Sequence, residues 1–244
     1  MLSLAIARST APSAADAGDD AVAPAWLGEA ERVRWLALAG DAREAFAASR
    51  ALLRRLLEST TGIAADDWQV TAQAGTAPVA ALRRPVDGSV DAVPVASLAH
   101  RLGWVAAAVA PSGGGRVGVD IECARPPRSD PRERAALMLG ADELACWHAL
   151  PESAREDALL RAWTAKEAFF KAAPAGDAPW DFRRLAAVPS EPARANVRLW
   201  AATSAPVQVA LCSDDAAALA AAVLQAPEDV AFEPSSFWRV SRVG

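Results

Sequence analysis

Two carboxylates alternate with apolar residues in the stretch Gly118-Val119-Asp120-Ile121-Glu122. Successive side chains of a β-strand point to opposite faces, so Asp120 and Glu122 share one face of the strand that this alternation predicts. Carboxylate oxygens, substrate phosphate oxygens and water are the ligands that Mg²⁺ prefers. The stretch therefore predicts half of a metal site, with a solvated acidic strand end as the commoner alternative.

A second set of charged side chains follows about 40 residues further along, in Trp163-Thr164-Ala165-Lys166-Glu167-Ala168-Phe169-Phe170-Lys171. This stretch lies within the longest predicted helix, from Ser153 to about Ala173. Glu167 and Lys171 are four residues apart, so they share one helix face. Aromatic and alanine neighbours argue against full exposure, and a charged pair in such surroundings needs a partner such as a metal or a phosphate.

Composition describes a globular protein of 244 residues with 52% hydrophobic and 23% charged residues. The net charge of -5 argues against a general affinity for nucleic acid or an anionic membrane. Three cysteines without C-x-x-C spacing favour a reducing, cytoplasmic location. No apolar run reaches the roughly 18 residues of a membrane span. Of the 25 basic residues only Lys166 and Lys171 are lysines, which suggests that arginine does not serve at these two positions.

Apolar periodicity predicts helices and then strands, twice over. Residues 11–25 are expected to form a loop after a short first strand, and Asp130 is expected to begin a helix as its N-cap. Further helices are expected at 27–58 and 153–173, and strands at 68–72, 95–98, 104–110, 117–121, 196–202, 207–212, 217–224 and 230–240. The strands expected at 104–110 and 219–224 look alike, a weak sign of duplication with a boundary near residues 111–116.

That boundary contains a G-x-G-x-x-G pattern at Gly113, Gly115 and Gly118. A dinucleotide-binding loop must open a helix, whereas residues 117–121 are expected to form a strand. An inter-strand loop is the favoured interpretation, and an NAD-dependent oxidoreductase is the alternative that this pattern alone would support.

Together, in this order and at this spacing, 118–122 and 163–171 resemble the bipartite signature of the 4'-phosphopantetheinyl transferases, especially the monomeric Sfp-type. The Arg84-Pro85 pair resembles the basic-Pro element of that family. Residues 99–104 resemble its Ser-His-x-x-x-Trp strand, and the segment around Arg50 resembles its early helix. The resemblance covers roughly Glu31 to Ala173.

The resemblance implies an α+β fold of two similar half-domains related by a pseudo-twofold duplication, with the active site in the cleft between them. The half-domains would be residues 1–114 and 115–244, the second carrying the metal-site motifs. It implies transfer of the 4'-phosphopantetheine moiety of coenzyme A to a serine of an apo acyl, aryl or peptidyl carrier protein, with release of 3',5'-ADP. It also implies a monomer, because the chain is already duplicated.

The resemblance also assigns residues to roles. Asp120, Glu122 and Glu167 would hold Mg²⁺, with Glu167 as general base and Asp120 and Lys171 also catalytic. Coenzyme A would be bound by Arg50, Arg84, His100, Arg101, Lys166 and Lys171, the first two at its 3'-phosphate. An acidic carrier protein would need a local basic surface, and the arginines beyond Glu122 are the candidates: Arg125, Arg128, Arg132 and Arg134. His148 is expected to be an ordinary helix histidine.

Three positions depart from the family pattern: Ala99 stands where Ser or Thr is usual, Arg101 where a small hydroxyl residue is usual, and Ala51 where a hydroxyl is common. These departures motivate a second hypothesis, a catalytically impaired coenzyme A binding or carrier-docking protein of the same fold.

Overall fold

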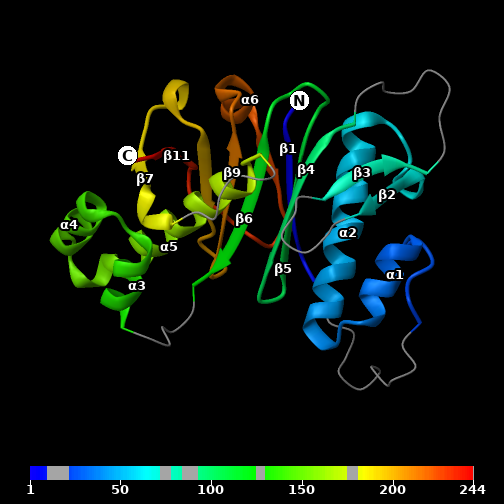
Figure 1. Cartoon of the computed structure of the whole chain (residues 1–244), viewed down its shortest axis with the longest axis horizontal. Coiled ribbons are helices and arrows are strands. Elements are labelled where there is room, and N and C mark those ends of the chain that lie inside the picture. Colours follow the sequence, from blue (N-terminus) through cyan, green and yellow to red (C-terminus); the bar gives the residue numbers. More distant parts are fainter. Residues whose placement is uncertain (10–21, 72–77, 84–92, 125–129, 175–180, 244) are drawn as a thin grey trace.

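The computed structural model describes residues 1–9, 22–71, 78–83, 93–124, 130–174 and 181–243 (Figure 1). Its helices are α1 (Glu29–Leu36), α2 (Gly40–Thr61), α3 (Pro131–Met138), α4 (Ala141–Ala149), α5 (Glu152–Lys171) and α6 (Ala216–Ala221), with 3₁₀ turns η1 (Ala65–Asp67), η2 (Phe182–Arg184) and η3 (Pro192–Arg194). Its strands are β1 (Ser3–Arg8), β2 (Trp68–Thr71), β3 (Val79–Leu82), β4 (Val95–Arg101), β5 (Trp104–Ala110), β6 (Val117–Cys123), β7 (Leu185–Pro189), β8 (Val197–Ala201), β9 (Val207–Ser213), β10 (Val223–Gln225) and β11 (Ser236–Arg242).

The strands form two sheets stacked between two long helices. The first sheet has the order β10-β1-β5-β4-β3-β2 and the second β6-β9-β8-β11-β7. One apolar core lies between the sheets, a second joins the first sheet to α2, and a third joins the second sheet to α5. Figure 1 shows α2 and α5 on opposite outer sides, with the strands between them. The α+β class is confirmed; the pseudo-twofold relation of the halves stays a prediction.

β5 is apolar at every position because both of its faces are buried. Its odd-numbered residues Val105, Ala107 and Val109 join the core under α2, and its even-numbered residues Ala106 and Ala108 join the core between the sheets. A strand buried on both faces has no solvent side, so a continuous apolar run replaces the usual alternation.

The C-terminal half contributes a strand to the first sheet. β10 pairs parallel with β1, with Ser3 opposite Val223, whereas β1 pairs antiparallel with β5 on its other side. The first sheet therefore does not correspond to one half of the sequence, since residues beyond 114 complete the edge that residues 1–114 begin, whereas all strands of the second sheet lie beyond residue 114.

The expected strand at 217–224 is wrong in most of its length. Asp215 caps a helix there, its Oδ1 accepting from the Ala218 N–H at 2.9 Å, and α6 occupies 216–221 before β10 begins. Alanine is the best helix former, so the N-cap decides the conformation of this alanine run. The similarity of 104–110 and 219–224 therefore reflects alanine content and not two equivalent strands. The strand expected at 230–240 begins only at Ser236.

The glycine pattern lies between two strands, as expected. Gly113 and Gly115 have φ angles of 74° and 79°, in the left-handed region that favours glycine. Gly118 lies within β6 beneath α5, where an added Cβ would lie 2.1 Å from the Ala168 carbonyl oxygen. The third glycine thus allows α5 to approach β6 closely. No helix in the described part of the chain is long and apolar enough to cross a membrane.

Candidate active site

The site begins where β4 lies beside β6. The Val119 N–H donates to Ser97 Oγ at 3.0 Å, and the Cys123 thiol donates to the Arg101 carbonyl at 3.5 Å. Both contacts join residues 22 apart in sequence, so the two strands run in the same direction. The carboxyl end of β4 is thereby placed beside Glu122.

Asp120 lies on β6 and is buried, 5% exposed. Its Oδ1 accepts from Lys171 Nζ at 2.6 Å, which joins β6 to the last turn of α5. Its Oδ2 is buried without a hydrogen-bond partner. Burial raises the pKa of Asp120 to about 6, with the negative charge of Glu122 adding to the rise and Lys171 opposing it. Half of this carboxylate is therefore available to a further positive group.

Glu122 is held from both sides. Trp163 of α5 donates its indole N–H to Glu122 Oε1 at 3.1 Å, and Arg101 Nε of β4 forms an ion pair with Glu122 Oε2 at 2.9 Å. The departure at position 101 therefore places a guanidinium directly on one carboxylate of the expected metal site.

Glu167 lies one turn before Lys171 on α5 and is half-buried. Burial raises the pKa of Glu167 to about 7; the charges of Asp120 and Glu122 add to the rise, and Lys171 opposes it. The charges of Asp120 and Glu122 therefore act on Glu167, so the three expected metal ligands lie in the same region of the molecule.

Positive groups surround these carboxylates. His100 is exposed, and its pKa is lowered by partial burial of the ring and by the charges of Lys171, Arg50 and Arg101. The charges that act on His100 thus come from α2, β4 and α5.

Arg50 reaches the site from α2. Its guanidinium lies 3.8 Å from the centre of the Phe46 ring, its Nη1 donates to Ser49 Oγ at 3.1 Å, and its Nε has no partner. Burial lowers the pKa of Arg50 to about 10, with Glu31 opposing the fall. A half-buried guanidinium whose Nε has no partner suits an anionic ligand.

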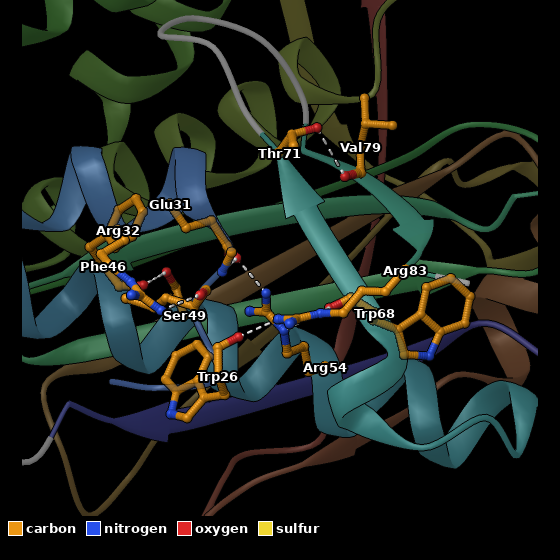
Figure 2. Close-up of polar contacts among 12 residues, drawn as sticks. Trp26, Glu31, Arg32, Phe46, Ser49, Arg54, Trp68, Thr71, Val79 and Arg83 are labelled. Carbon is orange, nitrogen blue, oxygen red and sulfur yellow. Dashed lines mark hydrogen bonds and ion pairs between the residues drawn. The ribbon is translucent and has the colours of Figure 1, made fainter. Parts of the chain in front are cut away.

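A buried ion pair lies behind Arg50, between α1 and α2. Arg54 Nη2 lies 2.5 Å from Glu31 Oε2, and Arg54 Nε donates to the Trp68 carbonyl at 3.1 Å. Arg83 donates to the carbonyls of Trp26 and Trp68. Figure 2 shows the Arg54 side chain among Glu31, Trp26 and Trp68. The sequence offered no sign of the Glu31 partner, because the pair joins residues 23 apart.

Lys166 is not brought into the site. Its ammonium is fully buried and donates to Glu143 Oε2 at 2.6 Å, to the Met138 carbonyl at 2.9 Å and to the Phe182 carbonyl at 3.1 Å. All three N–H groups are used, so none is left for coenzyme A. Glu143 was not singled out in the sequence, where it looks like any acidic residue of a helix's first turn.

The other expected residues have separate surroundings. Arg134 forms a double hydrogen bond with Glu156, at 2.9 and 2.5 Å, and Arg132 lies in the first turn of α3. His148 is exposed and edge-on to Trp147 at 5.1 Å. Arg84, Pro85, Arg125 and Arg128 lie outside the described residues.

The carboxylates fit Mg²⁺ in donor type and charge. All three supply oxygen, one buried oxygen of Asp120 lacks a partner, and their mutual repulsion would be relieved by a cation. In the part of the chain that the structure describes, however, no three His, Cys, Asp or Glu side chains already have the arrangement of a metal-ligand set. Lys171 and Arg101 lie on Asp120 and Glu122, so their carboxylates would rotate or exchange partners when a metal binds.

Comparison with known proteins finds a family model that matches part of the chain. The family model of the 4'-phosphopantetheinyl transferase superfamily matches residues 116–224, from the start of β6 to β10. That region contains all three carboxylates and Lys171, and the match agrees with the family resemblance seen in the sequence.

Solved structures include 16 matching chains. One is the crystal structure of Thermotoga maritima holo-[acyl-carrier-protein] synthase, with a TM-score of 0.30 and 22% sequence identity. The match covers 39% of this chain and 60% of the synthase, so it spans less than two thirds of that protein. No curated protein matches the chain.

Proposed function

We propose that this protein transfers the 4'-phosphopantetheine moiety of coenzyme A to a serine of an apo acyl, aryl or peptidyl carrier protein, releasing 3',5'-ADP. It would act as a monomeric, Mg²⁺-dependent enzyme of the holo-[acyl-carrier-protein] synthase type in the cytoplasm. The observation that carries the proposal is the buried Asp120 carboxylate, paired with Lys171 on one oxygen and unpartnered on the other, beside Glu122 and Glu167.

Mg²⁺ would be held by Asp120, Glu122 and Glu167 and, when bound, supplies positive charge against the pyrophosphate oxygens. Lys171 would bind a pyrophosphate oxygen and stabilise negative charge on the leaving 3',5'-ADP. Its ammonium carries three donors, of which the contact to Asp120 uses one. Such a preorganised donor matters most where charge develops in the transition state.

Glu167 would take the proton of the attacking serine. The serine Oγ forms a bond to the phosphorus of the phosphopantetheine arm, the bond from that phosphorus to the oxygen of 3',5'-ADP breaks, and the serine proton goes to a Glu167 carboxylate oxygen. Burial raises the pKa of Glu167 to about 7 in the metal-free protein. A bound Mg²⁺ would lower this pKa and would also acidify a serine hydroxyl close to it, so the carboxylate could still accept the serine proton.

Coenzyme A would extend from the carboxylates toward α2. His100 and Arg101 at the end of β4 would contact its phosphates, and Arg50, with its unpartnered Nε, would bind the 3'-phosphate. Arginine suits this role because its planar donors match phosphate oxygens. Arg84 is proposed for the same phosphate on the sequence resemblance alone.

The test is incubation of the purified protein with coenzyme A, Mg²⁺ and a panel of apo carrier proteins, read by intact mass. We expect a carrier to gain the mass of one phosphopantetheine arm, and the gain to vanish with chelator or with Glu167→Ala. Absence of any gain across the panel, although coenzyme A binds, would contradict transfer.

That second result would support the other candidate, a coenzyme A binding or carrier-docking protein without turnover. The observation that favours it is the ion pair of Arg101 Nε with Glu122 Oε2, at 2.9 Å, which occupies an expected metal ligand. Arg101→Ser would test this cause: if the arginine keeps Glu122 from the metal, the variant should transfer phosphopantetheine where the wild type does not.

A further inference from the structure

Glu143 and Lys166 form an ion pair deep between the helices that flank the second sheet. Lys166 is fully buried, and each of its three N–H groups has an acceptor, on Glu143, Met138 and Phe182. A surface ion pair has no such enclosure, so this contact fixes the position of the elements that it joins.

Glu143 is saturated as well. Its Oε2 also accepts from the Gly140 N–H at 3.0 Å, and its Oε1 accepts from the Ala187 N–H at 2.8 Å. One pair of side chains therefore ties α5 to the end of α3, the first turn of α4, η2 and β7. A single compact ammonium meets three acceptors there, which explains a lysine in a chain that otherwise uses arginine.

A continuous set of contacts leads from this pair to the site. Lys166 donates to the Phe182 carbonyl, the Phe182 ring lies 4.8 Å from the Trp163 ring, and Trp163 donates to Glu122 Oε1 at 3.1 Å. In addition, Lys166 directly precedes Glu167 on the same helix. The pair thus acts on two of the three site carboxylates, on Glu122 through Phe182 and Trp163 and on Glu167 through the backbone of α5.

We propose that Glu143 is a positioning residue: paired with Lys166, it sets the orientation of Glu122 and Glu167 for Mg²⁺, while touching neither metal nor coenzyme A itself. The inference rests on the proposed function for its catalytic readout. It predicts an effect on metal affinity and turnover, with little effect on coenzyme A affinity, because Arg50 and His100 lie on other elements and Lys171 is held separately by Asp120.

The variants are Glu143→Gln and Lys166→Met, with Glu233→Gln as the matched control. The control breaks a different and exposed ion pair of α5, between Arg161 Nη2 and Glu233 Oε2 at 3.2 Å. Partners that orient metal ligands typically change metal affinity or activity by about 10- to 100-fold. We therefore expect Glu143→Gln and Lys166→Met to weaken Mg²⁺ binding and to lower kcat by about that factor, with the KM for coenzyme A nearly unchanged.

Mg²⁺ affinity is measured by calorimetry in the presence of coenzyme A, independently of turnover, on variants whose circular dichroism matches the wild type. A single variant that leaves a buried charge could fail to fold, so the double variant Glu143→Gln/Lys166→Met is included because it removes both charges. It should fold and still bind Mg²⁺ about tenfold or more weakly.

Wild-type Mg²⁺ affinity in the folded double variant would overturn the inference, as would an equal loss in Glu233→Gln. A wild-type protein that binds Mg²⁺ but modifies no carrier would refute the transferase and not the positioning role, which the calorimetric difference between Glu143→Gln and wild type would still decide.

Discussion

Lys171 is the residue at which one substitution tests most of the proposed site. Lys171→Met keeps the aliphatic stem but removes the ammonium that lies 2.6 Å from Asp120. Loss of one donor that stabilises transition-state charge lowers turnover by about 100- to 1,000-fold. We expect a fall of that size in the rate of carrier modification, measured by intact mass over time.

The matched control for this change is Arg161→Met on the same helix. Arg161 pairs with Asp157 at 2.7 Å and with Glu233, away from the carboxylates. It should modify carriers at the wild-type rate. Equal losses of carrier modification in the two variants would contradict a specific role of Lys171 in the reaction.

The three cysteines are expected to differ in the reactivity of their thiols. Cys146 is exposed, whereas Cys123 and Cys212 are buried. Burial raises the pKa of Cys212 to about 12, so its reactive thiolate form is absent near pH 8. We expect a colorimetric thiol reagent at pH 8 to titrate one thiol in the folded protein and three after unfolding, and none rapidly in Cys146→Ser.

The raised pKa of Cys212 also makes the stability of the protein depend on pH. The unfolded chain loses the Cys212 proton above its ordinary pKa of 9.0, while the folded protein keeps it. The contribution of Cys212 to stability is therefore complete below pH 9 and declines as the pH rises further. Rapid reaction of Cys212 in folded protein would contradict its burial.

Individual residues of the site were largely predictable, because chemistry is local in sequence. Asp120 and Glu122 share a strand face, and Glu167 and Lys171 share a helix face, on spacing alone. The partner of Lys166 was not predictable, since Glu143 is 23 residues away and only the folded chain brings the two together. Burial of Lys166 likewise depends on η2 and β7, which follow it in the sequence.

At the scale of elements, the contact of α5 with β6 depends on Gly118. A Cβ at this position would lie 2.1 Å from the Ala168 carbonyl oxygen and 2.6 Å from the Ala172 backbone nitrogen. Both neighbours are backbone atoms, so only a shift of the helix could relieve the overlap. We expect Gly118→Ala to lower the free energy of unfolding by about 1–3 kcal/mol, measured by urea denaturation.

Gly28→Ala is the control for this change, because a Cβ at Gly28 would meet its nearest neighbour at 3.4 Å, an ordinary contact, and φ there is negative. It should cost less than about 1 kcal/mol. Gly118→Ala should also slow carrier modification, since Glu167 and Lys171 move with α5. Wild-type stability for Gly118→Ala would mean that α5 does not lie as close to β6.

The packing of α1 on α2 depends on Arg54 and Glu31, 2% and 4% exposed. Arg54→Met leaves the Glu31 carboxylate buried without its cation, which typically costs about 3–5 kcal/mol of folding free energy. The double variant Arg54→Met/Glu31→Leu should recover most of that loss, because neither charge remains. Urea denaturation of the two single variants and the double variant measures this.

The control for these Arg54 and Glu31 variants is Arg116→Met. The ion pair of Arg116 with Asp214 is exposed on both sides. Its stability should differ little from the wild type, as surface pairs contribute little. A double variant that is as unstable as Arg54→Met would show that packing, and not the unpaired charge, causes the loss.

The sequence predicted which segments form helices and strands better than it predicted which of them lie side by side. The alternation in 117–121 and the long helix at 153–173 appear as β6 and α5. The run at 217–224 was predicted wrongly, since alanine suits both a buried strand and a helix, and the Asp215 cap decided between them. Which strands are neighbours depends on long-range pairing, which periodicity does not contain.

At the scale of the whole molecule, the two halves of the chain share one core. Side chains from β1 and β5 meet side chains from β6 and β9 between the sheets, and β10 completes the first sheet. We expect fragments 1–114 and 115–244, expressed separately, to lack cooperative thermal unfolding, and to regain it when they are refolded together. The measurement is circular dichroism during heating, for each fragment and for the mixture.

A fragment that melts cooperatively alone would show that its half is an independent domain. The control is a single chain in which a flexible linker joins residues 114 and 115. It should melt as the intact protein does.

The parallel pairing of β10 with β1 also concerns the order in which the protein is made. During synthesis on the ribosome, β1 emerges more than two hundred residues before its neighbour β10. Until then one edge of β1 offers unpaired backbone groups to any strand nearby, which makes the nascent chain a target for chaperones and for aggregation. Expression yield should therefore depend on how fast translation proceeds past β10, in a way that the stability of the finished protein would not reveal.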